Sequence, residues 1–382
     1  MSKFSSLSDV AKLDNWRTTP YSKWSFHHVR EIVPSAEIKN NNQVIVPLSE
    51  NSKTFTNLDL PKIMDETETD AIVIAKGNNI LFEKYNNEMT RSSPHILFSV
   101  SKSILGLLVG TLVENKELKE DDLVTKFIPE LFNSAYSDAT VRDLLDMRVG
   151  VKFNEDYTAI SGPIVNYRYA ANWNPVPEGV KVGDLRSFMS TLTERDGNHG
   201  ERFHYVSPNT DLMAWVCERA TGVRYADLLS ERLWTPIGAE YPGYITVDRI
   251  GGARAAGGVC FTARDLARVG LLIANGGVLN KKQIVPKNWV DDIITNGSDD
   301  AWKKRHGEDE FGDMPMHYRS FWYIQKDGDP LIHGVGIHGQ YLFIDPKLNL
   351  SISWFSSDNE ATGSNYISKV MNAVKLIRNE LK

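Results

Sequence analysis

Hydrophobic residues gather in strand-like runs in two parts of the chain that lie far apart in sequence. In the first part, AIVIAKGNNILFEKY at residues 71–85, two β-rich runs are separated by a Gly-Asn-Asn triplet. These residue types tolerate a positive φ, so the stretch predicts a β-hairpin. In the second part, residues 341–344 and 351–355 flank Asp, Pro and Asn turn residues and predict another hairpin, with a strand before it at 321–326.

Helical patterns occupy much of the chain between these strands and its last residues. Residues 365–382 carry apolar side chains at helical spacing, which predicts an amphipathic helix lying on a sheet. Two further segments have a threonine followed three residues later by an aspartate, as in a capping box; the pairs are Thr140 with Asp143 and Thr262 with Asp265.

This order of elements predicts an α/β (α+β) fold. An antiparallel sheet built from N- and C-terminal strands is flanked by helices and carries an inserted, mainly helical subdomain. We expect residues 1–65 to wrap the core, residues 66–115 and 240–382 to form the sheet domain, and residues 116–239 to form the helical subdomain. The active site is expected between the two.

Composition and charge narrow the class of partner. The chain has 382 residues, 41% of them hydrophobic, and a formal net charge of -6. It is long enough for a sizeable core, and it lacks the basic character expected of a partner for nucleic acid or an anionic membrane. No signal-peptide core or run of about 20 apolar residues is seen, so we expect a cytoplasmic protein. Cys217 and Cys260 are too few for a disulfide framework and are expected to be buried thiols.

The stretch FSVSKSILGLLVG, residues 98–110, places two serines and a lysine at the start of an apolar helix. Residues three apart share a helix face, so Ser99 and Lys102 can come within hydrogen-bonding reach. Burial would lower the pKa of the lysine, which could then accept the serine proton and make the hydroxyl a nucleophile. The alternative is that Ser99 only caps the helix and Lys102 reaches solvent from its end.

Tyr205 precedes a second amphipathic helix, in the segment GERFHYVSPNTDLMAWVCERATG, where Asn209 or Thr210 is expected to be the cap. Two interpretations of this tyrosine are open. It is a core aromatic, or it relays protons between Ser99, Lys102 and a leaving group.

Five motifs in order resemble the serine β-lactamase and penicillin-binding-protein superfamily. Within it, the chain is most similar to the class C-like branch of family VIII-type esterases and 6-aminohexanoate-dimer hydrolases. The motifs are FSVSKS, LLDMRVGVKF, FHYVSPNTDLMAW, GGARAAGGVCFTARDLARVG and HGVGIHGQYLFIDP. The resemblance implies the β-lactamase/transpeptidase-like fold. It also implies that Ser99 is the acylated nucleophile, Lys102 its base and Tyr205 the proton relay, with the backbone amides of Ser99 and Ile337 forming the oxyanion hole.

The same resemblance suggests Tyr157, Ser207 and Gly336 as residues that contact the substrate. Two further candidates come from their places in the sequence: His338, near the expected oxyanion strand, and Trp173. Trp173 lies in a proline-rich loop and either covers the cleft or pins that loop. Ser207 stands where the family usually has Asn, and Gly334 replaces the lysine that helps to hold a substrate carboxylate. Loss of that charge removes a hydrogen bond of about 1.5–3 kcal/mol, which favours a linear amide or ester over penicillin-like acids.

No cofactor and no metal are expected, because no zinc-binding histidine motif accompanies His333 and His338. The expected partner is a small-molecule amide or ester, and a homodimer is compatible with the sequence. Two alternatives stay open: β-lactamase or D,D-peptidase activity, and a catalytically silent ligand-binding protein of the same fold.

Overall fold

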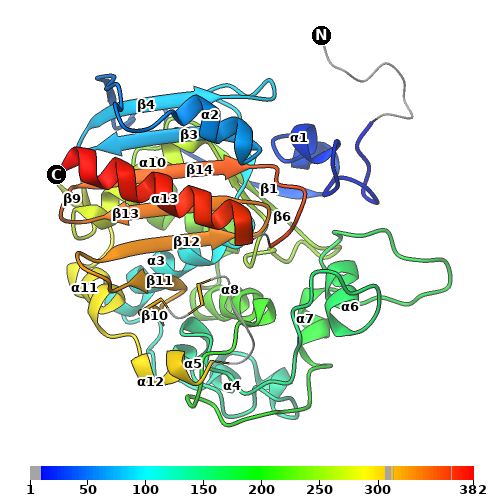
Figure 1. The fold of residues 1–382 in the computed structure, drawn as a ribbon. Coiled ribbons are helices and arrows are strands. Elements are labelled where there is room, and N and C mark those ends of the chain that lie inside the picture. Colours follow the sequence, from blue (N-terminus) through cyan, green and yellow to red (C-terminus); the bar gives the residue numbers. More distant parts are fainter. Residues whose placement is uncertain (1–9, 306–310, 313, 363) are drawn as a thin grey trace.

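An eight-stranded sheet forms the centre of the protein (Figure 1). The computed structural model describes residues 10–305, 311–312, 314–362 and 364–382, so the first nine residues of the predicted wrapping segment lie outside it. In spatial order the strands are β10 (Met316–Arg319), β11 (Trp322–Gln325), β12 (Leu331–Gly336), β13 (Gln340–Asp345), β14 (Leu350–Ser356), β3 (Thr69–Lys76), β4 (Asn79–Tyr85) and β2 (Ser49–Glu50).

Both predicted hairpins are confirmed. Strands β3 and β4 pair antiparallel around Gly77, whose φ of +57° is one that glycine adopts without strain. Strands β13 and β14 pair in the same way, and β14 lies antiparallel to β3. Strands from the two ends of the sequence therefore meet in one sheet, as the hydrophobic pattern predicts.

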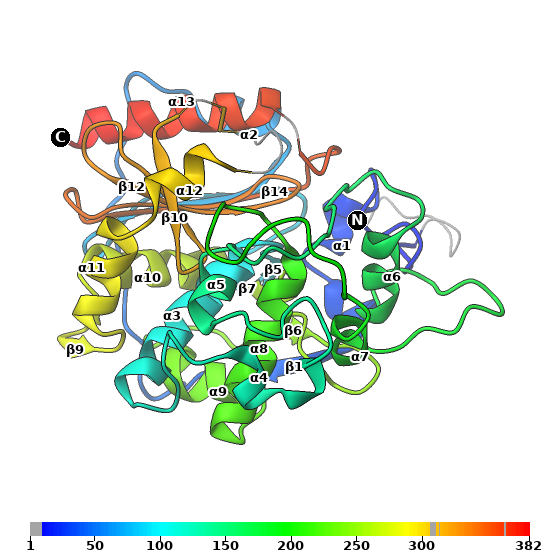
Figure 2. The same cartoon turned by 90° about the horizontal axis from the view of Figure 1, so that it is seen from below.

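Helices cover both faces of this sheet (Figure 2). α13 (Ser364–Leu381), the predicted C-terminal helix, and α2 (Leu60–Glu66) lie on one face. α3 (Val100–Glu114) and α10 (Ala263–Ala274) lie on the other. The predicted cap of α10 is confirmed, because the Thr262 hydroxyl accepts a hydrogen bond from the amide of Asp265.

A mainly helical region lies on the same side of the large sheet as α3, opposite to α13, in Figure 2. Its helices are α4 (Val124–Phe127), α5 (Val141–Leu145), α6 (Pro163–Ala170), α7 (Leu185–Met189), α8 (Ser207–Thr221) and α9 (Tyr225–Leu229), with a 3₁₀ turn (Pro129–Leu131) and a π turn (Ser230–Trp234). The capping box of Thr140 and Asp143 at α5 is confirmed.

The predicted cap of α8 is wrong. The helix begins at Ser207, so Asn209 and Thr210 lie inside its first turn. Proline is tolerated in the first turn of a helix, and Pro208 therefore does not delay its start. The amide of Ser207 is satisfied instead by the carboxylate of Glu155, at 2.6 Å, from a distant loop.

A second, four-stranded antiparallel sheet joins the N-terminal segment to the region around Ser99. Its strands in order are β1 (Ser35–Ile38), β6 (Gly243–Thr246), β7 (Val259–Phe261) and β5 (His95–Ile96). The remaining elements are α1 (Ser22–Ser25), a 3₁₀ turn (Val29–Glu31), the small β8–β9 hairpin (Val278–Leu279 and Lys282–Gln283), α11 (Lys287–Thr295) and α12 (Asp299–Lys303).

Two further expectations concern thiols and location. Cys217 and Cys260 are both buried free thiols, as expected. None of the helices in the described part of the chain is both long and apolar enough to cross a membrane. The cytoplasmic location and the domain boundaries stay predictions.

Candidate active site

Ser99 sits at a sharp turn between β5 and α3. The amide of Leu97 donates to the carbonyl of Val259 on β7 at 2.8 Å, and the next residue, Phe98, has a φ of +42°. A non-glycine residue in this region costs roughly 1–3 kcal/mol, which the surrounding packing must offset. The Phe98 ring is held by Phe26 at 5.0 Å and Trp173 at 5.9 Å between ring centroids. The strained turn presents Ser99 as the N-cap residue of α3.

The alternative structural roles of Ser99 and Lys102 do not describe their contacts. The side chain of Ser99 makes no capping hydrogen bond to α3. Lys102 is only 1% exposed, so its amine does not reach solvent from the helix end. Its Nζ donates to Ser99 Oγ at 2.9 Å and to the carbonyl of Ala256 at 2.8 Å.

The surroundings of Lys102 prepare its amine to accept a proton. The pKa of Lys102 is lowered to about 7, chiefly by burial and also by the nearby charge of Arg254, while the carboxylates of Glu155 and Asp211 partly oppose this shift. An amine with a pKa close to 7 is neutral in a large fraction of molecules at physiological pH. Lys102 can therefore serve as a base for Ser99 Oγ.

A buried charge pair supports the carbonyl that holds Lys102. Asp211 on α8 accepts a hydrogen bond from the amide of Ala256 at 2.8 Å and forms an ion pair with Arg254. The hydroxyl of Tyr167 also donates to Asp211. Because the carbonyl of the same Ala256 residue accepts from Lys102, Asp211 fixes the orientation of the amine indirectly.

Tyr205 lies beside Lys102, just before α8. Lys102 Nζ is 4.8 Å from the centre of the Tyr205 ring, and the tyrosine is partly buried against the core. The structure thus brings the three predicted catalytic side chains together. A phenol close to a lysine amine is suited to proton transfer.

Strand β12 runs directly beside the nucleophile. A methyl group added at Gly336 would lie 2.6 Å from the carbonyl oxygen of Leu97 and 3.0 Å from the amide nitrogen of Ser99. Only glycine allows the strand to approach so closely. The next residue, Ile337, is therefore carried to the vicinity of the Ser99 amide, as expected of a second oxyanion donor.

His338 follows Ile337 in the turn after β12. Its φ is +59°, its ring packs 5.3 Å from Phe98, and its Nδ1 lies 2.8 Å from the carbonyl oxygen of Asp358. Burial lowers the pKa of His338 to about 4, so the ring is neutral at physiological pH. A neutral buried ring at this position shapes the turn without adding charge to it.

Two of the predicted substrate residues meet at a residue that the sequence did not single out. Tyr157 donates its hydroxyl to Glu155 at 2.8 Å, and both the amide and the hydroxyl of Ser207 donate to the same carboxylate. Glu155 also acts electrostatically on Lys102. The only sequence signal for Glu155 is its place two residues before Tyr157, because its other hydrogen-bond partner, Ser207, is 52 residues away.

Trp173 is buried, with 4% of its surface exposed. Its indole nitrogen donates to the hydroxyl of Thr246 at 3.1 Å, and a methyl group at Gly257 would lie 3.0 Å from its ring. These contacts are those of a tryptophan that pins its loop. A contact of Trp173 with substrate stays a prediction.

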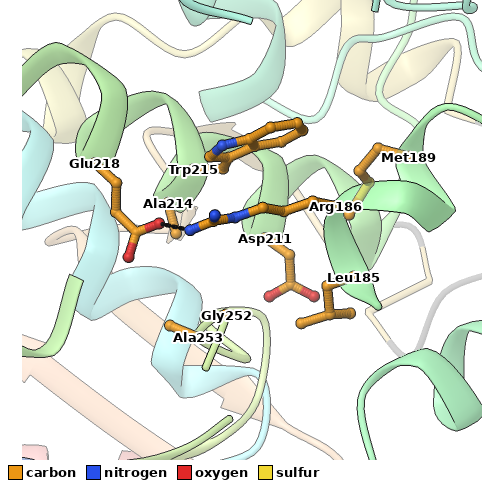
Figure 3. Close-up of a pocket in the computed structure, with 9 residues that line it drawn as sticks. All are labelled: Leu185, Arg186, Met189, Asp211, Ala214, Trp215, Glu218, Gly252 and Ala253. Atoms are coloured by element: carbon orange, nitrogen blue, oxygen red, sulfur yellow. Dashed lines mark hydrogen bonds and ion pairs between the residues drawn. The ribbon is translucent and has the colours of Figure 1, made fainter. Parts of the chain in front are cut away.

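A separate pocket lies between α7, α8 and the turn at residues 252–253 (Figure 3). Arg186 lies across it and donates to Glu218 at 2.6 Å, with its guanidinium 5.6 Å from the centre of the Trp215 ring. Asp211 reaches the wall of this pocket from α8, whereas none of the predicted catalytic side chains lines it. The pocket therefore borders Asp211, which positions Lys102 through Ala256, and it is distinct from the Ser99 site.

A serine and a buried lysine one helical turn apart, beside a strand that carries a backbone donor, are the parts of a serine acyl-transfer enzyme with a lysine base. A family model described as Beta-lactamase matches residues 60–368, and the chain belongs to this family. It is 35% identical over 348 residues to the 6-aminohexanoate-dimer hydrolase of Paenarthrobacter ureafaciens, covering 90% of this chain and 88% of that protein. The chain is therefore a serine hydrolase, as the motifs predict.

Solved structures agree on the fold. A Bacillus anthracis protein proposed to be a 6-aminohexanoate-dimer hydrolase is 26% identical, covers 98% of both chains and superposes with a TM-score of 0.89. A family VIII carboxylesterase is 16% identical, covers 82% of this chain and 94% of its own, and has a TM-score of 0.61. The predicted fold class and family resemblance are confirmed.

Proposed function

We propose that this protein hydrolyses a linear amide, and related short esters, through an acyl-enzyme on Ser99. The observation that carries the proposal is the 2.9 Å contact between Lys102 Nζ and Ser99 Oγ, made by an amine whose pKa is lowered to about 7. This geometry suits deprotonation of the serine in the step that forms the new bond.

In the first half of the proposed reaction, neutral Lys102 takes the proton of Ser99 Oγ while the oxygen attacks the substrate carbonyl. The resulting oxyanion accepts hydrogen bonds from the backbone amides of Ser99 and Ile337. Tyr205 passes a proton to the departing amine, the carbon–nitrogen bond breaks, and an ester of Ser99 remains. Water then attacks this ester, loses a proton to the same base system and releases the carboxylic acid.

The preference for linear substrates rests on Gly334. A methyl group there would lie 3.2 Å from Val100 and 3.3 Å from the hydroxyl of Ser103, so β12 packs closely on α3 where the family commonly has a lysine. The cation that holds the carboxylate of a β-lactam is lost, while the backbone oxyanion donors remain. Similarity to a 6-aminohexanoate-dimer hydrolase also favours a linear amide.

The test is covalent labelling combined with turnover. A fluorophosphonate probe should add one label to the wild-type protein, located at Ser99 by peptide mass spectrometry, and Ser99→Ala should lose both the label and hydrolysis of 6-aminohexanoate dimer and p-nitrophenyl esters. Ser101→Ala is the matched control: this serine lies in the same helix turn, accepts a hydrogen bond from the amide of Val259, and should still be labelled. Wild-type hydrolysis by folded Ser99→Ala would overturn the proposal.

The same experiment separates the alternatives. A folded wild-type protein that takes no label and turns over no substrate would be a silent ligand-binding protein. Nitrocefin as the best substrate in the panel would favour β-lactamase activity. The homodimer stays a prediction, to be measured by sedimentation.

A further inference from the structure

The N-terminal segment places a guanidinium without an acidic partner near the active site. Arg17 is partly exposed, and within the described part of the chain no carboxylate forms an ion pair with it. Its polar contact is with the side-chain oxygen of Asn174. An arginine that is largely withdrawn from water and lacks an anion is uncommon, because charged groups are usually paired when they leave solvent.

Aromatic side chains fix the position of this guanidinium. The carbon Cζ of Arg17 lies 5.3 Å from the ring centre of Trp16 and 5.7 Å from that of Trp173. The two tryptophans are themselves joined, since the Trp16 indole donates to the carbonyl of Trp173 at 3.1 Å. An arginine stacked in this way loses little further entropy when it binds a planar anion.

Two other arginines contribute to the positive potential but are already engaged. Arg254 pairs with Asp211, and Arg168 donates to backbone carbonyls of the loop that carries Tyr157. Burial, followed by the charges of Arg168 and Arg254, lowers the pKa of Arg17 to about 9, so Arg17 still carries its charge at pH 7. Arg17 is the member of this group that is available to an incoming anion.

Contacts around the nucleophile connect Arg17 to the reaction site. The Trp16 ring is stacked 6.2 Å from the ring of Phe98, the residue before Ser99. The charge of Arg17 also acts on His338, the residue after Ile337. Arg17 therefore stands on the side of the nucleophile formed by Phe98 and His338, whereas Gly334 packs against Val100 on α3.

We propose that Arg17 binds a carboxylate on the substrate, away from the scissile carbonyl, so that the protein selects linear amides and esters bearing a free acid. This inference rests on the proposed hydrolase function and specifies its substrate class. A guanidinium binds a carboxylate with two parallel charge-assisted hydrogen bonds, which gives direction as well as affinity. The cation lost at Gly334 is thus replaced by one from a different segment, at a position suited to an extended substrate.

The experiment compares substrates that differ in one carboxylate. For the acyl half, the pair is mono-p-nitrophenyl adipate and p-nitrophenyl hexanoate; for the amine half, it is N-butyryl-6-aminohexanoate and N-butyryl-hexylamine. The quantity measured is the ratio of kcat/KM for the acid to that for the neutral partner. In Arg17→Gln this ratio should fall about tenfold or more in one of the two pairs.

Three controls keep the result interpretable. Arg91→Gln removes an exposed arginine elsewhere and should keep the wild-type ratio, and Arg17→Lys should restore part of the ratio that glutamine loses. In the wild-type protein, added salt should lower the ratio, which tests the charge even if a variant fails to fold. Unchanged ratios in both pairs, or a wild-type ratio insensitive to salt, would overturn the role of Arg17. Activity in Ser99→Ala would instead overturn the hydrolase proposal.

Discussion

At the scale of single residues, the proposed chemistry depends on the environment that the fold creates around Lys102. Its position three residues after Ser99 is encoded locally, but the value of its pKa depends on burial and on charges from other segments. A lysine on an exposed helix would be protonated at pH 7 and unable to act as a base.

The pH dependence of the reaction tests whether the pKa of Lys102 is lowered in this way. Because the neutral amine is the reactive form, kcat/KM should increase as the pH is raised through an apparent pKa near 7, and it should be low at more acidic pH. Tyr205 can share this apparent value if the two groups titrate together. Lys102→Met should lower kcat/KM by about 10²–10⁴-fold, whereas Lys152→Met, at an exposed lysine, should leave the profile unchanged. An acylation rate in Lys102→Met equal to that of wild type would assign the base elsewhere.

Glu155 provides an independent test of the same environment. Its negative charge raises the pKa of Lys102, so Glu155→Gln should let that pKa fall and should move the acidic limb of the pH–rate profile to lower pH. The glutamine oxygen can still accept from the amide of Ser207, which preserves the start of α8. Glu194→Gln is the control, because this carboxylate pairs with Lys152 on the surface. A shift to higher pH would contradict the assigned electrostatics.

At the scale of elements, the site depends on how closely strand β12 approaches the start of α3. The two proposed oxyanion donors belong to different elements, and Gly336 allows these elements to approach closely. We therefore expect the packing of the strand to control the distance between the two donors.

Gly336→Ala tests this dependence. The added methyl group would meet Leu97 and the Ser99 amide, so the strand must move outward, and kcat should fall by about 10²–10³-fold, the effect typical of losing one oxyanion donor. Gly197→Ala is the matched control, since its nearest neighbour is a side-chain atom of Arg202 at 3.5 Å. Equal activity of the two variants would show that β12 does not set the position of the donor.

At the scale of the whole molecule, the N-terminal segment is part of the core and of the site. Trp16 and Phe26 are 1% and 0% exposed and contact the turn before Ser99. The strained conformation of Phe98 is held by these rings, so we expect stability and catalysis to be coupled there.

Trp16→Ala should therefore have two effects. It should lower the free energy of unfolding by about 3–5 kcal/mol, as expected for truncating a buried tryptophan, and it should lower kcat in the protein that remains folded. Trp24→Ala, at a partly exposed tryptophan stacked on His28, should cost less stability and leave kcat close to wild type. Chemical denaturation and turnover at a temperature where both variants are folded measure the two effects. A large loss of stability with unchanged kcat would show that the N-terminal segment stabilises the fold without influencing catalysis.

What the sequence determined by itself is local. The hairpin turns, the threonine caps of α5 and α10, the C-terminal amphipathic helix and the spacing of Ser99 and Lys102 follow from residues within a few positions of one another. Such features are set by backbone preferences and by the period of the hydrophobic pattern, so they can be read from the chain directly. The cap of α8 could not be read in this way, because it comes from Glu155 in another loop.

Only the tertiary structure decided which distant groups meet at Ser99. Asp211 supports Lys102 through Ala256, β12 brings Gly336 to the Ser99 amide, and Arg17 from the N-terminal segment packs on Trp16 and Trp173, whose rings contact Phe98. Contacts between residues many positions apart depend on how whole elements pack, which no local pattern specifies. The lowered pKa of Lys102 belongs to this second group as well, because the packed core removes water from around the amine and so favours its neutral form.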